Sequence, residues 1–120
     1  MDASAQENLA AAEKARVDLD YETAKSLFET VLKADDQCPE ALHGLGYVEM
    51  MGFGEFDEGI ALMVRAASLA DTNQKILLDL AKAYAMLAED EKAKSWFEKV
   101  VAIDPTSKQG AEAQNQLQYY

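Results

Sequence analysis

Two side chains could form a nucleophilic centre, because the thiol of Cys38 and the imidazole of His43 are close together in the sequence. A histidine on the neighbouring turn can take the proton of a cysteine and leave a reactive thiolate. No third group that would orient the pair is apparent, and the sequence has no phosphate-binding glycine loop, metal-ligand spacing or Ser/His/Asp set. We therefore predict that the protein is not an enzyme and binds no cofactor or metal.

Clustered carboxylates could also carry acid and base chemistry. They occur as Asp35-Asp36 and as Glu89-Asp90-Glu91. Both clusters fall where turns and helix starts are expected, and carboxylates there interact favourably with the helix dipole and with water. We interpret them as solvated charges.

The elements that position these side chains are predicted to be helices. The chain has 120 residues, of which 49% are apolar, so it can bury a modest core. Alanine, leucine, glutamate, lysine and methionine dominate and favour helices, whereas the 6 glycines and 2 prolines form no linker. The composition predicts a single all-α domain over residues 1–120.

Charge and hydropathy restrict the partners. Twenty-two acidic and 11 basic side chains give a net charge of −11, which repels nucleic acid and anionic membranes. No run approaches the roughly 18 apolar residues of a membrane span, and the first residues lack the features of a signal peptide. Cys38 is the single cysteine, so no internal disulfide can form. We expect a cytoplasmic protein with no nucleic-acid partner and no membrane insertion.

Apolar and small side chains recur along the chain with a period of about 34 residues, as helical repeat proteins require. Each repeat has a small residue in its first helix and, in its second helix, a small residue followed four positions later by a large one and then by another apolar residue. The four rows are Ala12, Gly46 and Ala81; Ala24, Gly59 and Ala93; Phe28, Met63 and Phe97; and Val31, Ala66 and Val100. Small side chains allow helices to cross closely.

This pattern resembles the tetratricopeptide repeat, and residues 74–107 match it best through Leu80-Ala81, Tyr84 and Asp104-Pro105. The resemblance implies a right-handed α-α superhelix of about seven antiparallel helices. Its repeats would span about 5–38, 39–73 and 74–107, followed by a capping helix over about 107–118. The capping helix would cover the last repeat with a polar, amide-rich outer face.

Local signals predict the helix ends. Ser4 with Glu7 matches a capping box, Asp20 can cap the second helix, and Thr106 with Gln109 can cap the last. Proline is tolerated in a first turn at position 39, and at position 105 it should stop the sixth helix.

The second repeat differs from the others. It has an extra residue near Gly52 and Gly54, which allow a wider turn because glycine adopts positive φ. Its Glu49 stands where a large core residue is expected.

In this fold the first helix of each repeat lines a concave groove, and a stripe of residues on these helices is left over from packing. The stripe is near neutral at its edges and apolar and methionine-rich at its centre, which suits varied partners. We predict that a peptide or helix of a partner protein binds there. The predicted groove residues are Arg16, His43, Tyr47, Met50, Met51, Lys75, Leu78, Lys82 and Met86, with Glu112 and Tyr119 as possible additions. The alternative for each methionine is that it fills a gap between helices.

Many tetratricopeptide domains hold acidic chaperone tails in a clamp of Lys, Asn and Arg side chains. Four of the matching positions here are Leu9, Glu13, Gly44 and Asp79, and Lys75 alone fits. Since the two acids would repel a carboxylate, we do not expect that clamp; a ligand carboxylate would be held by Lys75 and Lys82. The function expected is an adaptor or scaffold that is a monomer or weak homo-oligomer, with a self-assembling scaffold or a dedicated chaperone for a secreted protein as alternatives.

Overall fold

The structure, a computed structural model, describes all residues from 1 to 120 and contains seven α-helices and no strand. The predicted all-α fold class is confirmed. The helices are α1 Ala3–Val17, α2 Tyr21–Ala34, α3 Pro39–Phe53, α4 Phe56–Leu69, α5 Gln74–Met86, α6 Asp90–Ile103 and α7 Lys108–Leu117. The chain divides into two compact units. Unit 1 is Met1–Leu69, with α1 to α4, and unit 2 is Ala70–Tyr120, with α5 to α7.

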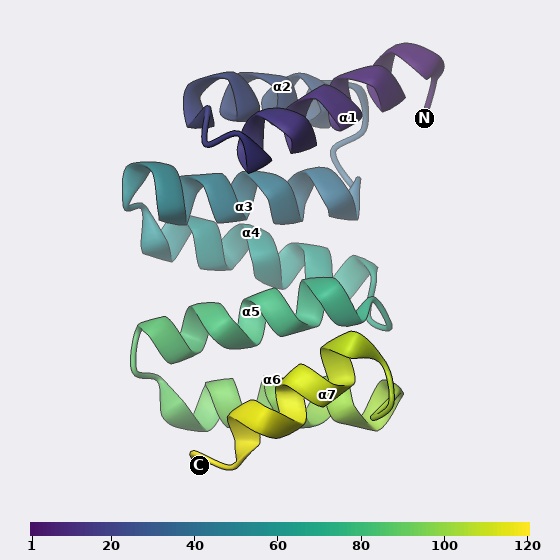
Figure 1. The fold of residues 1–120 in the computed structure, drawn as a ribbon. Coiled ribbons are helices and arrows are strands. Elements are labelled where there is room, and N and C mark those ends of the chain that lie inside the picture. The colour runs from purple at the N-terminus through teal and green to yellow at the C-terminus, as the bar shows by residue number, and fades with distance from the viewer. The chain divides into compact units, whose positions relative to one another are not determined.

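Unit 1 consists of two antiparallel hairpins, α1 with α2 and α3 with α4, and α3 packs on both helices of the first hairpin (Figure 1). Phe28 lies fully buried at the centre of its core. A side chain at Gly44 of α3 would overlap the Phe28 ring, so the aromatic ring requires a bare backbone opposite it. In the second hairpin, a Cβ atom at Gly46 would lie 2.7 Å from the carbonyl oxygen of Gly59. The approach of Gly46 to Gly59 follows from small residues at predicted positions, whereas Gly44 was not predicted to be a small-residue contact.

Unit 2 consists of the α5 and α6 hairpin, with α7 packed on α6 and touching α5 (Figure 1). Phe97 and Ala113 are fully buried between these helices. The side-chain amide of Gln74 donates to the carbonyl oxygens of Val100, at 2.9 Å, and of Asp104, at 2.8 Å. These bonds tie the start of α5 to the end of α6, where the Val100 carbonyl also accepts from the Asp104 amide at 3.4 Å.

The predicted repeat rows are confirmed in both units, since all twelve residues of the four rows are buried. Glu49 is also buried, with 3% of its surface exposed, which agrees with its core register although it is charged. Its Oε1 atom lies 3.0 Å from Lys25 Nζ, at ion-pair distance but without hydrogen-bond geometry. The contact raises the pKa of Lys25. A neighbouring cation is what allows a carboxylate to be buried here.

Two of the predicted caps are wrong by one or two residues. Asp2, rather than Ser4, caps α1 by accepting from the Ala5 amide at 2.8 Å. Ser107, rather than Thr106, caps α7, and its Oγ accepts from the Gly110 amide at 2.9 Å. In both places several adjacent side chains can cap, and the residue that does so depends on where the chain enters the helix.

The other predicted helix ends are confirmed. Asp20 caps α2, Pro39 begins α3, and α6 ends at Ile103 before Pro105. The wider turn between α3 and α4 is also present. Its Gly54 has φ of +69°, whereas Gly52 remains helical against Tyr21.

Candidate peptide-binding surface

In unit 1, α1 and α3 bring two of the predicted groove residues into direct contact. The Arg16 guanidinium lies 4.9 Å from the centroid of the Tyr47 ring, within the range of a cation–π interaction. The same guanidinium is held by Glu13, with Nη2 2.9 Å from Oε2. Both Arg16 and Tyr47 are half-buried. They form a rigid platform whose planar faces can support an apolar or aromatic side chain.

The other predicted residues of unit 1 divide by burial. Met51 is exposed, whereas His43 and Met50 are buried, with 5% and 4% of their surfaces exposed. Met50 lies against Gly59 of α4, where its thioether occupies the space that the glycine leaves. This position corresponds to the alternative that Met50 fills a gap between helices. The predicted stripe in unit 1 therefore reaches solvent through the exposed Met51 and the half-buried Arg16 and Tyr47.

In unit 2, three predicted residues line one cavity of about 230 Å³ between α5 and α7. Lys75, Leu78 and Lys82 stand at i, i+3 and i+7 on one face of α5, which brings their side chains to the same side of the helix. Leu78 is 4% exposed and forms an apolar wall of the cavity. The remaining lining residues are Asp79 of α5 and Lys108, Gln109 and Glu112 of α7.

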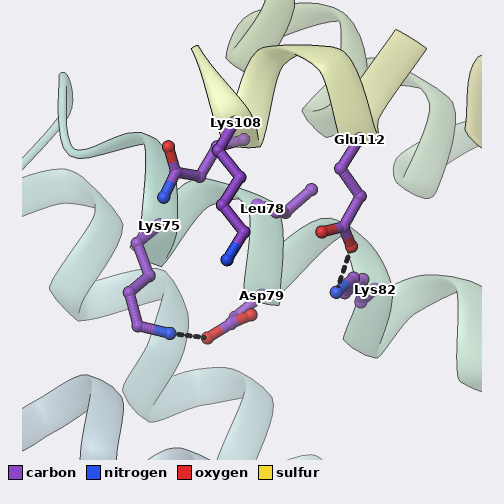
Figure 2. A pocket seen from close by; sticks show the side chains of 7 residues that line it. Lys75, Leu78, Asp79, Lys82, Lys108 and Glu112 are labelled. Carbon is purple, nitrogen blue, oxygen red and sulfur yellow. Dashed lines mark hydrogen bonds and ion pairs between the residues drawn. The ribbon is translucent and has the colours of Figure 1, made fainter. Parts of the chain in front are cut away.

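The charges of this cavity are paired incompletely (Figure 2). Lys75 Nζ lies 3.5 Å from Asp79 Oδ2, and Lys82 forms an ion pair with Glu112 of α7. Lys108 extends toward the cavity from the first turn of α7, and no carboxylate lies within ion-pair distance of it. Three ammonium groups thus face two carboxylates. The cavity carries a local excess of positive charge in a chain whose net charge is −11.

The ion pairs of the cavity can exchange for a ligand at little cost. Lys75 and Lys82 have 58% and 44% of their side-chain surface exposed. Exposed ion pairs contribute about 0.2–1 kcal/mol each, so a carboxylate of a ligand can replace the partner of either lysine. Met86, the last predicted residue, is 55% exposed on the final turn of α5 and does not line the cavity.

Lys108 and Gln109 were not among the predicted site residues, because α7 was expected to be a polar cap and Glu112 and Tyr119 were the only predicted groove residues of this region. A lysine in the first turn of a helix is an available signal, because a positive charge there opposes the helix dipole and has no stabilising role within the helix. The structure shows the reason for its position, since α7 packs with its first turn over the face of α5.

The arrangement of Cys38 and His43 does not support nucleophilic chemistry. Burial raises the pKa of the Cys38 thiol, which disfavours the thiolate that acts as nucleophile. Its Sγ lies 3.5 Å from Oε2 of Glu40, and this acid also opposes ionisation. No group of three or more His, Cys, Asp or Glu side chains is arranged to hold a metal ion.

No helix in the structure has the length and apolar character needed to cross a membrane. In comparisons with known proteins, the family description "Tetratricopeptide repeat" matches residues 50–117. No curated protein matches the chain in sequence at a significant level.

Several solved structures share the fold. The type III secretion translocator chaperone SycD of Yersinia enterocolitica superposes with a TM-score of 0.84 at 15% identity, over 95% of this chain and 81% of SycD. PcrH of Pseudomonas aeruginosa, in complex with the chaperone-binding region of PopB, has a TM-score of 0.85 at 15% identity, over 98% of this chain and 97% of PcrH. The first tetratricopeptide domain of Spaghetti (RPAP3), bound to the HSP90 peptide SRMEEVD, has a TM-score of 0.84 at 19% identity, over 99% of this chain and 92% of that domain.

Proposed function

The chain belongs to the tetratricopeptide repeat family, and we propose that it is a non-catalytic adaptor that binds a short segment of a partner protein on its first-helix faces. The observation that carries the proposal is the cavity between α5 and α7, where the apolar Leu78 lies beside three lysines. This combination fits a segment that presents an apolar side chain next to an acidic one. In unit 1, Arg16, Tyr47 and Met51 form another surface that can contact an apolar side chain of a partner.

The apolar contact and the exchange of ion pairs contribute different amounts of binding energy. Leu78 is already 4% exposed, so the surface removed from water on binding belongs mainly to the ligand's apolar side chain, at about 25 cal/mol for each Å² buried. The exchange of an exposed ion pair adds at most about 1 kcal/mol. Affinity should therefore come mainly from the apolar side chain, while the lysines select segments that carry an acid and orient them.

The test uses two synthetic peptides that contain leucine and either glutamate or, in the matched control, glutamine. Titrated into isotope-labelled protein, the glutamate peptide should shift the resonances of Leu78, Lys82 and Lys108. The substitution Lys108→Gln should weaken its binding by up to about fivefold, which corresponds to the loss of one exposed ion pair.

Lys33→Gln is the matched control, because Lys33 is an exposed lysine of α2 in unit 1 and its replacement changes the net charge equally. It should leave the affinity for the glutamate peptide unchanged. Equal weakening by both substitutions would show that the peptide responds only to net charge. Resonance shifts confined to α2, α4 and α6 would also contradict the proposal.

A dedicated chaperone for a secreted protein is the second candidate. It is favoured by the similarity to SycD, which binds a peptide of the translocator YopD, and to PcrH, which binds the chaperone-binding region of PopB. Under this hypothesis the neighbouring genes encode a secretion apparatus and its substrate, and co-expression keeps that substrate soluble. A genomic neighbourhood without secretion genes would contradict it.

We also propose a cytoplasmic location, a monomer or weak homo-oligomer, and no nucleic-acid partner. A net charge of −11 supports the last two, because it makes copies of the chain repel one another and repel phosphate. Sedimentation over a range of concentrations tests the oligomeric state. A stable large assembly would instead indicate a self-assembling scaffold.

A further inference from the structure

The turn between α1 and α2 contains an uncommon backbone conformation at Leu19, whose φ is +64°. The Leu19 amide donates to the carbonyl of Arg16 at 3.1 Å, and the Asp20 amide donates to that of Ala15 at 2.8 Å. These two bonds define a Schellman motif, in which the left-handed position is usually glycine. Any residue with a Cβ atom costs roughly 1–2 kcal/mol relative to glycine in this conformation, because the Cβ atom approaches the following carbonyl oxygen.

The other two hairpin turns show what this position requires. Gly54 occupies the left-handed position after α3, and Ala88, with φ of +57°, occupies it after α5. The α5 turn forms the same pair of bonds, since the Glu89 amide donates to the Tyr84 carbonyl at 3.0 Å and that of Ala88 to Ala85 at 3.0 Å. Glycine stands at the left-handed position in one turn and alanine in another, while the third turn has the much larger apolar side chain of leucine.

Packing within the chain does not compensate for the strain at Leu19. Its surface is 69% exposed, and so is that of Val17 at the end of α1. Two more apolar side chains, Met51 and Phe53, are 44% and 40% exposed at the end of α3. We refer to these four residues as the turn patch.

The members of the turn patch lie at one end of unit 1. The end of α3 meets the start of α2, because a Cβ atom at Gly52 would lie 2.7 Å from Cβ of Tyr21, two residues after Leu19. Phe53 is held over α2, with its ring centroid 5.0 Å from Lys25 Nζ. The two hairpin turns are on the same side of unit 1 in Figure 1.

Acidic side chains surround the turn patch. The two nearby lysines already have partners, since Lys14 pairs with Asp18 at 2.9 Å and Lys25 with Glu49. The first turns of α2 and α4 and the residues before them carry five carboxylates with no Lys or Arg at ion-pair distance. These are Asp20, Glu22, Glu55, Asp57 and Glu58.

We propose that the turn patch docks a cationic amphipathic segment of a partner protein, with Leu19 as the anchor that the segment buries. A strained and exposed leucine is disadvantageous in the free protein, and a role in binding accounts for both properties. The acidic rim selects the occupant, because lysine or arginine beside an apolar stripe complements it, whereas a second copy of this chain would bring carboxylates against carboxylates. The site is separate from the cavity between α5 and α7 and does not depend on its function.

Two synthetic helical peptides of about 15 residues provide the probe, one with leucine on one face and lysine on the other, and one with glutamate in place of every lysine. At about 0.15 M salt, the lysine peptide should bind and shift the resonances of Val17, Leu19 and Phe53, and the glutamate peptide should not. Leu19→Gly should weaken the binding of the lysine peptide by about tenfold, as expected for the loss of a buried leucine.

The same substitution should raise the midpoint of thermal unfolding by a few degrees, because glycine relieves the strain at positive φ. Ala88→Gly is the matched control, since it places glycine at the equivalent position of another hairpin and should leave the lysine peptide's affinity unchanged. Lys108→Gln should also leave that affinity unchanged, which separates this site from the proposed cavity. The proposal is overturned if Leu19→Gly binds the lysine peptide as tightly as the original protein, or if both peptides bind equally.

Discussion

Replacing Gly110 with alanine tests whether the close approach of α7 to the chain before it determines the cavity. Gly110 is buried in the first turn of α7. A Cβ atom there would lie 3.0 Å from the carbonyl carbons of Asp104 and Pro105, and closer still to the carbonyl oxygen of Asp104. The obstacle is backbone, so it cannot rotate away as a flexible side chain would.

The magnitude follows from two opposing effects. Alanine in place of glycine within a helix should stabilise it by about 1 kcal/mol. Overpacking typically costs about 1–3 kcal/mol, and a rigid obstacle places this site at the upper end. The net loss should be about 2 kcal/mol in the free energy of unfolding, which lowers the thermal midpoint by roughly 8 °C for a chain of this size. The sign is opposite to that expected from helix propensity alone.

The assays are thermal unfolding, followed by circular dichroism, and hydrogen exchange of the α7 amides. Gln114→Ala is the control, because Gln114 is exposed on the same helix and its replacement gains propensity without a clash. Gly110→Ala should also reduce binding of the peptide with leucine and glutamate that tests the cavity between α5 and α7, since Lys108 and Glu112 move with α7. If Gly110→Ala is as stable as Gln114→Ala and its α7 amides are equally protected, the reasoning is refuted.

Three further predictions concern charged and reactive groups. Lys25→Met leaves the buried Glu49 carboxylate without its cation and should lower the free energy of unfolding, measured in urea, by about 1–3 kcal/mol. Adding Glu49→Gln to this variant should recover most of the loss. An unchanged free energy of unfolding in Lys25→Met would contradict the prediction. The hydroxyl and amide of Thr106 lower the pKa of Asp104 in the folded protein. The Asp104 carboxylate therefore stabilises the fold above its unfolded pKa of about 3.9. This stabilisation is lost as the pH falls through the lower folded pKa. Asp104→Asn should therefore lose less stability than the original protein between neutral and strongly acidic pH, and equal losses would show that Asp104 is not involved. Burial raises the pKa of the Cys38 thiol, so alkylation by iodoacetamide at neutral pH should be slow until denaturant is added, and rapid reaction of the folded protein would refute this.

The sequence was least informative at the proposed binding surface. Met50 and Met51 are adjacent and chemically identical, yet one is buried against Gly59 and the other is exposed. Periodicity assigns a face to each residue of a helix. Whether that face is covered depends on the position of the neighbouring helix and on where that helix has small residues such as Gly59. The same limit applies to His43, which the stripe placed in the groove and the structure buries.

The repeat, the helices and the buried rows were determined by the sequence itself, because the contacts that they require recur at a fixed spacing along the chain. Ala24, Phe28 and their equivalents could therefore be assigned to the core without a structure. The cavity could not, since Lys82 and Glu112 come together only when α7 packs on α6, and no periodic pattern encodes the direction in which a single capping helix runs. Tertiary structure also decided the role of Leu19, because strain and exposure are properties of the folded turn and are not visible in the residue type.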